Sequence, residues 1–439
     1  MKKRILAVLL TAAMAISMLA GCGGSKVASD GKVLNIYCWN DEFQRRVQDH
    51  YPGYEIVDTT TGKIGDVTVK WNITPTTDNA YQNNLDTTLL GQADAAADDK
   101  VDIFLVEADY ALKYVNSDYS LPVYDLGIKE ADLADQYQYT KDIVTDGNGV
   151  LKGLSWQAAP GVMFYNRDVA LEVFGTEDPA AVQEYVKDWD TFVATAATLK
   201  DAGYQVCSSI MDTYRVYSNN VSQPWVVDGK IVIDANIEKW VTDSKALYDA
   251  GYVGNHAVWG EEWNKGFYPE GKVFAYFGPA WLINFCMADG AEGSVATAGR
   301  WGATEGPQGF YWGGTWICAA AGTDNGDLVK DIMLQLTTNA DIMKGIVEKD
   351  DDFANNKPTM EAMATSDYSS RILGGQNPLA MYAANADNLD LSNLSAYDQA
   401  CNEEFQNAIQ NYLDGKATYE EAIELFYTGV IEKHPELTR

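Results

Sequence analysis

The sequence contains few of the residues that usually bind zinc. It has only three histidines, His50, His256 and His434, and none lies near a cysteine or another histidine at a metal-binding interval. Zinc sites in proteins are built from three or four such side chains, often at short spacings. We therefore expect no zinc site, and we assign no residue to a metal.

Cysteine is scarce as well. After Cys22, the remaining five cysteines are widely scattered and lie mostly within apolar runs: Cys38, Cys207, Cys286, Cys318 and Cys401. A disulfide framework uses an even number of cysteines at characteristic spacings. We interpret these five as small buried hydrophobic side chains.

Signature motifs of two large enzyme groups are missing. The sequence has no Gly-x-Ser-x-Gly, which presents the nucleophile of many hydrolases, and no Gly-x-x-x-x-Gly-Lys, which binds phosphate. Gly147, Gly149 and Gly153 miss the dinucleotide-binding spacing by one residue and follow no expected strand, so turn chemistry explains them. We expect neither a cofactor nor an enzyme of these groups.

Basic residues are few compared with acidic ones. Lys and Arg total 32 against 63 Asp and Glu, which gives a net charge of −31. A surface of this charge repels the phosphates of nucleic acid and the headgroups of anionic lipid. Nucleic acid is therefore not an expected partner.

The N-terminus has the form of an export signal. Lys2, Lys3 and Arg4 precede an apolar run over residues 5–20, which ends in small residues. The run is shorter than the ~20 apolar residues that span a bilayer, and no later run is long enough to do so. We expect residues 1–21 to be a signal peptide.

The cleavage region Leu19-Ala20-Gly21-Cys22 resembles the bacterial lipobox. The resemblance implies that Cys22 becomes the new N-terminus and carries a diacylglyceryl group, whose two acyl chains hold a protein at a membrane where one would exchange. Residues 22–32 would be the lipidated cysteine and a flexible tether, on the extracellular face of the cytoplasmic membrane. The alternative is an ordinary signal peptide with an incidental cysteine.

The first part of the mature chain alternates strands and helices. Residues 33–39, 67–73 and 101–106 have the composition of strands, and segments with helical spacing of apolar residues lie between them. A β-α-β-α-β order predicts a parallel sheet, and ligands of such sheets bind at the carboxyl ends of the strands. This order places Trp39 and Asn40 on the same rim as Asp109.

A second α/β unit follows Gly161. The tail is expected to be largely helical over residues 392–432, with a break at Asp414-Gly415, and Asp228-Gly229-Lys230 is typical of a hairpin turn. We expect strands at 162–165, 205–210, 273–277 and 316–321 and helices at 166–174, 189–202 and 327–337.

Several short motifs run in one order through nearly the whole mature chain. They are GVMFYNRD (residues 161–168), WDTF (189–192), GKV (271–273) leading to GPAW (278–281), Gly306-Pro307, WGGTW (312–316) and GKAT (415–418). In this order, and together with the lipobox, they resemble the extracellular solute-binding proteins that serve carbohydrate ABC transporters, the maltose-binding-protein type.

The resemblance implies an α/β fold of the periplasmic-binding-protein-like type II, with two α/β lobes and a ligand cleft at the hinge. One lobe would comprise residues 33–160 and 317–365, and the other residues 161–316 and 366–439. The chain would cross between them near residues 158–163 and again near 311–316.

A sugar presents C–H faces that suit flat aromatic rings, and hydroxyl groups that suit carboxylates and amides. The sequence has 12 Trp and 26 Tyr, more than a core usually needs. By resemblance, Asp109 is the carboxylate that accepts ligand hydroxyls, and Trp281 is the stacking aromatic after Gly-Pro. A helix-capping Asp and a core Trp are the alternatives.

The other candidate ligand-binding residues are assigned because the expected fold would place them at the same cleft. Local capping explains Asp212 and Tyr214 equally well, and a favourable interaction with the helix dipole explains Glu42. Trp225, Trp259 and Trp263 are interpreted as packing residues. The remaining candidates are Trp39, Asn40, Trp156 and Trp312.

We therefore expect the substrate-binding lipoprotein of an ABC importer, which captures a sugar or oligosaccharide between two lobes and delivers it to the membrane permease. It would act as a monomer and catalyse no reaction. One alternative is a cationic ligand such as a polyamine, held by Trp faces and acidic side chains. Another is a secreted glycoside hydrolase, which would use two carboxyl groups.

Overall fold

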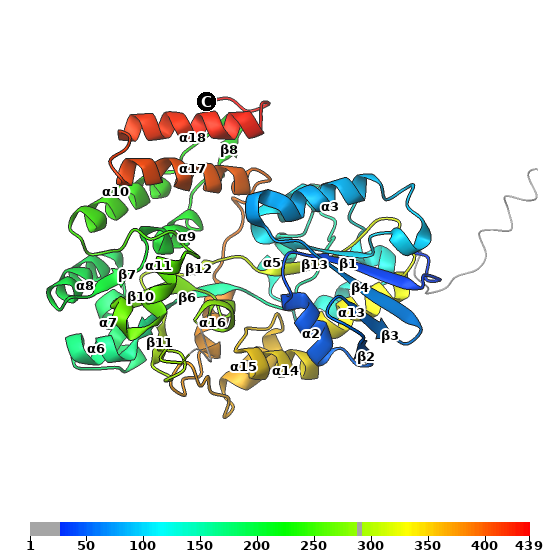
Figure 1. Ribbon diagram of the computed structural model, residues 1–439, viewed down its shortest axis with the longest axis horizontal. Helices are drawn as coiled ribbons and strands as arrows, with labels where there is room; N and C mark the ends of the chain where they lie inside the picture. Colours follow the sequence, from blue (N-terminus) through cyan, green and yellow to red (C-terminus); the bar gives the residue numbers. More distant parts are fainter. Residues whose placement is uncertain (1–26, 288–291) are drawn as a thin grey trace, which may run out of the picture.

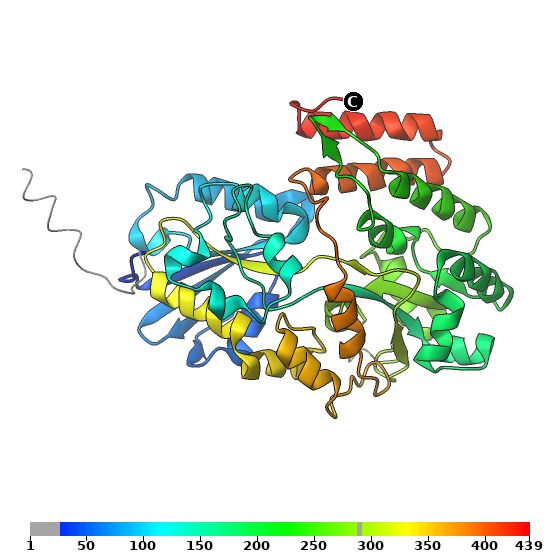
Figure 2. The same ribbon diagram turned by 180° about the vertical axis from the view of Figure 1, so that it is seen from behind.

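A computed structural model of the chain describes residues 27–287 and 292–439. The chain forms two α/β lobes, each built on its own sheet (Figures 1 and 2). The predicted signal peptide and Cys22 lie outside the described residues. Within the described ranges, no helix combines the length and the apolar composition that crossing a bilayer requires.

The first lobe contains a six-stranded sheet in the order β13 (Thr315–Ala319), β5 (Ile103–Glu107), β1 (Val33–Cys38), β4 (Val67–Ile73), β3 (Thr61–Ile64) and β2 (Tyr54–Ile56). β1 pairs in parallel with both β4 and β5, which confirms the predicted strand order. The sheet is nevertheless mixed, because β13 is antiparallel to β5 and the β2-β3 hairpin adds two antiparallel strands. Its helices are α2 (Glu42–His50), α3 (Ala80–Leu90), α4 (Ala111–Val115), α5 (Gln138–Asp142), α13 (Gly326–Thr338), α14 (Ala340–Asp350) and α15 (Lys357–Ala364).

The second lobe contains a sheet in the order β11 (Trp301–Thr304), β6 (Pro160–Asn166), β10 (Val273–Gly278) and β7 (Gln205–Cys207), with β12 (Phe310–Tyr311) also paired to β6. β6 is antiparallel to β10 and to β11, whereas β10 and β7 are parallel. The predicted hairpin is confirmed as β8 (Val226–Val227) and β9 (Lys230–Ile231). The helices are α6 (Arg167–Phe174), α7 (Pro179–Val186), α8 (Trp189–Asp201), α9 (Tyr214–Ser218), α10 (Ala235–Asp249), α11 (Glu261–Asn264), α12 (Trp281–Cys286), α16 (Leu379–Asp387), α17 (Asp398–Leu413) and α18 (Tyr419–Lys433).

One predicted strand is shorter than expected. The strand expected over residues 205–210 ends at Cys207, and the 3₁₀ helix η6 (Ile210–Thr213) follows. The reason is local: the Ser209 side chain accepts a hydrogen bond from the backbone of Met211, and Asp212 accepts one from the backbone of Ser209. This capping box turns the chain out of the sheet.

The chain returns from the second lobe to the first in only three residues. β12 pairs with β6 in the second lobe, and β13 begins at Thr315 in the first. Trp312, Gly313 and Gly314 lie between them, and both glycines have positive φ angles of 63° and 106°. Only glycine adopts such angles without strain. The residue boundaries that we expected for the two lobes stay a prediction.

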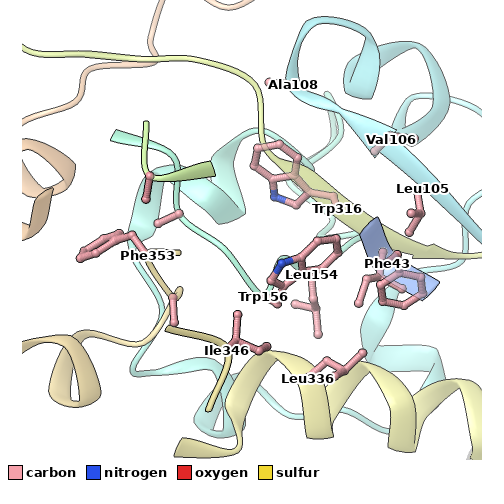
Figure 3. Close-up of a cluster of buried hydrophobic side chains, with 14 of the residues drawn as sticks. Phe43, Leu105, Val106, Ala108, Leu154, Trp156, Trp316, Leu336, Ile346 and Phe353 are labelled. Atoms are coloured by element: carbon pink, nitrogen blue, oxygen red, sulfur yellow. The ribbon is translucent and has the colours of Figure 1, made fainter. Parts of the chain in front are cut away.

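Apolar side chains form two clusters. The larger one begins in the first lobe and continues into residues 263–303, and a separate cluster fills the rest of the second lobe. In the first lobe, Phe43 stacks on Trp156 among aliphatic side chains that include Leu336 and Ile346 (Figure 3). Four of the five cysteines in the described ranges are buried and all five are free, as expected from their positions.

Candidate ligand-binding site

Two strand ends of the first lobe carry the predicted aromatic and acidic groups. Trp39 follows β1, and the neighbouring β5 ends at Glu107 and continues into the 3₁₀ helix η3 (Ala108–Tyr110). Glu107 accepts a hydrogen bond from the backbone N–H of Asp109 at 2.8 Å, which fixes this turn. The rings of Trp39 and Tyr110 meet edge to face, 6.3 Å apart. The pairing of β1 with β5 therefore brings Trp39 and Asp109 to one rim.

Asp109 of the first lobe forms an ion pair with Arg215 of the second. Nη1 of Arg215 donates to Oδ1 of Asp109 at 2.8 Å, and Nη2 donates to Oδ2. This bidentate arrangement is the strongest hydrogen-bonded pairing that a guanidinium makes with a carboxylate. Both side chains are only 16% exposed. We call this contact the inter-lobe ion pair, because it joins η3 directly to α9.

Two further carboxyl groups lie around the inter-lobe ion pair, one from each lobe. Burial, together with the charge of Asp109, raises the pKa of Glu107 to about 8, although Arg215 lowers it. Burial also raises the pKa of Asp398 to about 7, against hydrogen bonds from Ser395 that lower it. Burial alone would lower the pKa of Arg215, but Asp109 raises it. Near neutral pH, Glu107 can therefore donate a hydrogen bond as well as accept one.

Three tryptophans pack against one another, two in the second lobe and one, Trp312, in the segment that returns to the first lobe. The ring of Trp259 lies 6.2 Å from that of Trp281 at an interplanar angle of 26°, and 5.5 Å from that of Trp312. Nε1 of Trp281 donates to the carbonyl oxygen of Trp312 at 3.0 Å. Trp259 is 48% exposed and has a positive φ of 71°. We call Trp259, Trp281 and Trp312 the tryptophan cluster; it offers a flat apolar face with polar edges.

The tryptophan cluster lies next to the acidic rim of the first lobe. A Cβ placed on Gly313 would lie 3.4 Å from Oε1 of Glu107 and 3.7 Å from Cζ2 of Trp281. Glu107 of the first lobe and Trp281 of the second therefore both border Gly313, the residue at which the chain passes between the lobes. An aromatic face and a carboxyl group that meet at a lobe junction have the chemistry to bind a sugar.

Asn40 and Glu42 have local partners. Oδ1 of Asn40 accepts a hydrogen bond from the backbone N–H of Glu42 at 3.0 Å, at the start of α2. Oε1 of Glu42 accepts one from Nε2 of Gln157 at 3.1 Å and lies 3.6 Å from Nη2 of Arg46. Both side chains are partly exposed. Their contact with a ligand stays a prediction.

Trp156, Asp212 and Tyr214 are buried. Trp156 is enclosed in the first-lobe core against Phe43 (Figure 3). Oδ1 of Asp212 accepts a hydrogen bond from Nε1 of Trp263 at 2.8 Å, and the Tyr214 hydroxyl donates to Oδ1 of Asn402 at 2.6 Å. Asp212 is linked to the tryptophan cluster through Trp263, whose ring lies 5.5 Å from that of Trp259. Contact of these three residues with a ligand stays a prediction, and the site proposed below does not include them.

Several residues of the site were not recognised from the sequence. Glu107 and Arg215 each lie within two residues of a predicted candidate, Asp109 and Tyr214 respectively, but neither was itself predicted. Trp259, which we interpreted as a packing residue, packs against Trp263, Trp281 and Trp312, and it is also 48% exposed. Trp225 and Trp263 are buried as expected.

The space around the inter-lobe ion pair is small. A cavity of about 40 Å³ borders Asp109, Arg215, Tyr311 and Asp398. It has room for about one water molecule, and small-molecule sites are ~300–1,000 Å³. Among the described residues, no group of three or more His, Cys, Asp or Glu side chains is arranged to hold a metal ion. A sugar therefore needs the lobes to part before it can enter beside Asp109.

Stability is expected to depend on pH through Glu107. Its carboxyl group binds a proton more tightly in the folded state, so its contribution is complete below the unfolded pKa of about 4.3 and is lost as pH rises toward about 8. The melting temperature should fall as the pH rises over this interval. In Glu107→Gln this decrease of melting temperature with pH should be smaller. The measurement is thermal unfolding at a series of pH values, with the exposed Glu130→Gln as control. Identical profiles for Glu107→Gln and the unmodified protein would contradict this assignment.

Comparison with known proteins adds an independent line of evidence. A sequence profile described as bacterial extracellular solute-binding protein matches residues 55–371. No curated protein matches the chain.

Solved structures share the fold. A crystal structure of an extracellular solute-binding protein of family 1 is 18% identical, with a TM-score of 0.73, over 91% of this chain and 99% of its own. An ABC transporter associated binding protein from B. animalis subsp. lactis Bl-04, in complex with β-1,6-galactobiose, is 18% identical, with a TM-score of 0.69, over 93% and 99%. The sugar-binding protein MalE from Xanthomonas citri is 15% identical, with a TM-score of 0.67, over 92% and 98%. These likenesses confirm the expected two-lobed fold.

Proposed function

Because the chain belongs to the family of bacterial extracellular solute-binding proteins, we propose that it captures a sugar between its lobes and delivers it to the permease of an ABC importer. The observation that carries this proposal is that Glu107 of the first lobe and Trp281 of the tryptophan cluster both border Gly313, while the neighbouring Asp109 pairs with Arg215 of the second lobe. Trp281 and Trp259 stack on the C–H face of the sugar. Glu107, Asp109 and Arg215 bind its hydroxyls. Trp39 contacts the sugar at the first-lobe edge of the site.

The mechanism follows from the position of the inter-lobe ion pair. Asp109 and Arg215 have too little free space beside them for a sugar, so the ligand binds when the lobes are apart. Closure then adds contacts from the second lobe, and the ligand favours the closed state by its differential affinity for that state. Specificity arises because a wrong ligand leaves buried carboxyl or guanidinium groups without partners.

We extend the proposal to the location of the protein. Cys22 carries the lipid that anchors the mature chain on the outer face of the cytoplasmic membrane, and residues 22–32 act as the tether. The protein is a monomer, and it catalyses no reaction. An assay for released reducing sugar on incubation with oligosaccharides tests the last point, and we expect no release.

A cationic ligand such as a polyamine is the second candidate, and one observation favours it. Three carboxyl groups, Glu107, Asp109 and Asp398, surround the single guanidinium of Arg215. A cation stacked on the tryptophan cluster would balance this charge. The raised pKa values of Glu107 and Asp398 point the other way, because protonated carboxyl groups need no cation.

A thermal-shift screen tests the proposal and separates the two candidates. A ligand at about 100 times its Kd stabilises the folded state by ~2.7 kcal/mol, a shift of several degrees or less in a chain of this size. We expect a rise in melting temperature with members of the series glucose to maltotetraose or galactose to galactobiose. Spermidine and putrescine should leave it unchanged. A rise with the polyamines alone would contradict sugar binding.

A further inference from the structure

The inter-lobe ion pair is surrounded by more acid than base. Glu107 and Asp109 lie at the end of β5 in the first lobe. Arg215 on α9 and Asp398, the first residue of α17, belong to the second lobe. Both terminal nitrogens of Arg215 bond to Asp109, so this one cation balances only one of the three carboxyl groups. We call these four residues the inter-lobe acid cluster.

The inter-lobe acid cluster has almost no water beside it. The cavity that borders Asp109, Arg215 and Asp398 holds about 40 Å³, enough for about one water molecule. A carboxyl group that has lost its hydration and lies near another carboxylate favours its protonated form. Burial and then the charge of Asp109 accordingly raise the pKa of Glu107 to about 8, and burial raises the pKa of Asp398 to about 7.

The other titratable groups that face the cluster add no second cation. Burial holds the pKa of four neighbours above the ordinary value, so they stay neutral: Tyr110, Tyr214, Tyr311 and Cys401. Glu403 of α17 acts on Glu107, but it lies 3.3 Å from Nζ of Lys433, which offsets its charge. Asp234 and Asp390 border the cavity and accept hydrogen bonds from their own segments. Glu107 and Asp398 are therefore the groups whose protonation relieves the excess of negative charge.

Parting the lobes would remove the causes that favour the protonated forms. Glu107 would leave with the first lobe and Asp398 with the second, and water would reach both. Their pKa values would return toward the ~4 of carboxyl groups in water. Both groups thus bind a proton more tightly in the closed arrangement than in the open one. Their contribution to closure is complete below pH ~4 and is lost as the pH rises through about 7 and about 8.

We infer that closure of the two lobes takes up protons from the solvent at Glu107 and Asp398, so that acidity promotes closure and a rise in pH parts the lobes. The inference rests on the proposed function, because it takes the lobes to part and close. It adds a second control of closure to that of the ligand. A ligand that favours the closed state shares this equilibrium, so it is bound more tightly at lower pH.

Small-angle X-ray scattering of the unliganded protein between pH 5 and pH ~8.5, at constant ionic strength, tests the inference. The ratio of closed to open molecules should fall by up to about tenfold per pH unit for each of the two groups, and the radius of gyration should rise. In the double variant Glu107→Gln, Asp398→Asn the radius should stay small throughout, since the amides imitate the protonated forms. Each single variant should keep part of the response.

Asp352→Asn is the matched control. Asp352 is also a buried carboxyl group, and burial raises its pKa to about 7. It lies 3.4 Å from Nη2 of Arg46, and its other charged neighbours, Glu42 and Asp350, belong to the first lobe as well. Its protonation therefore does not depend on the distance between the lobes. The variant should show the same dependence of the radius of gyration on pH as the unmodified protein.

Three results would overturn the inference. They are a constant radius of gyration in the unmodified protein, an unaltered response in the double variant, and an equal loss of response in Asp352→Asn. The pH series of the unmodified protein decides without any variant, and circular dichroism at each pH separates parted lobes from unfolding. Because no sugar enters this experiment, its failure leaves the proposed function to the thermal-shift screen.

Discussion

Replacing Trp281 with alanine is expected to weaken sugar binding by about a hundredfold, because a partly buried aromatic at the centre of a site carries ~2–4 kcal/mol of its binding energy. Trp281 packs against both other members of the tryptophan cluster and lies beside Glu107. Isothermal titration calorimetry with the best ligand of the thermal-shift screen measures the effect.

Trp189 provides the matched control. It is also a partly buried tryptophan of the second lobe. Its ring stacks on that of Tyr217 at a centroid distance of 4.3 Å, and among the described residues it has no ring contact with the tryptophan cluster. Trp189→Ala should lower the melting temperature about as much as Trp281→Ala and leave the affinity within about twofold. Equal losses of affinity in the two variants would contradict the assignment of Trp281 to the ligand.

Removing Arg215 is expected to open the unliganded protein. Arg215→Leu leaves the carboxyl group of Asp109 beside Glu107 with no cation, and an uncompensated charge in a fully buried pair costs ~3–5 kcal/mol. The pair is 16% exposed, so we expect about half of that cost. This is still enough to shift a balanced equilibrium strongly toward parted lobes. Small-angle X-ray scattering should record a larger radius of gyration.

A double-mutant cycle and a second arginine complete the test. Asp109→Leu should act like Arg215→Leu, and the double variant should be more closed than either, because it leaves no unpaired charge. Arg300 forms its ion pairs with Asp168 and Glu177 inside the second lobe, so Arg300→Leu should not change the radius of gyration. If Arg300→Leu and Arg215→Leu expand the protein equally, the inter-lobe ion pair does not hold the lobes together.

The strand ends of the first lobe could be predicted because their causes are local. β1, β4 and β5 are apolar and β-rich, and the segments between them have helical spacing. Three such strands in series must pair in parallel with their carboxyl ends on one side. This reasoning alone placed Trp39 and Asp109 on a common rim, where the structure has them.

Elements with a weak local pattern were missed. β2 is three residues long and mostly exposed, so Tyr54–Ile56 shows no alternation of buried and exposed side chains. The strand expected over residues 205–210 stops early because hydrogen bonds around Ser209 compete with the sheet. In both cases a short-range competitor or a short length removed the periodic signal on which strand prediction depends.

The sequence did not indicate which of several adjacent side chains contacts the other lobe. Asp212, Tyr214 and Arg215 lie on one turn, yet only Arg215 reaches the other lobe, while Asp212 bonds to Trp263 and Tyr214 to Asn402. Which side of a short helix faces the partner lobe depends on the packing of the whole lobe. The same applies to Trp156, which is enclosed in the core, and Trp259, which is exposed.

The sequence by itself determined the α/β alternation, the acidic composition and the supply of aromatic and acidic side chains, since each follows from composition or from neighbours a few residues apart. Tertiary structure alone decided that Asp109 meets Arg215, 106 residues away, and that Glu107 and Trp281 both border Gly313. Such meetings depend on the angle between two lobes, and that angle is the sum of many distant packing contacts that no local pattern records.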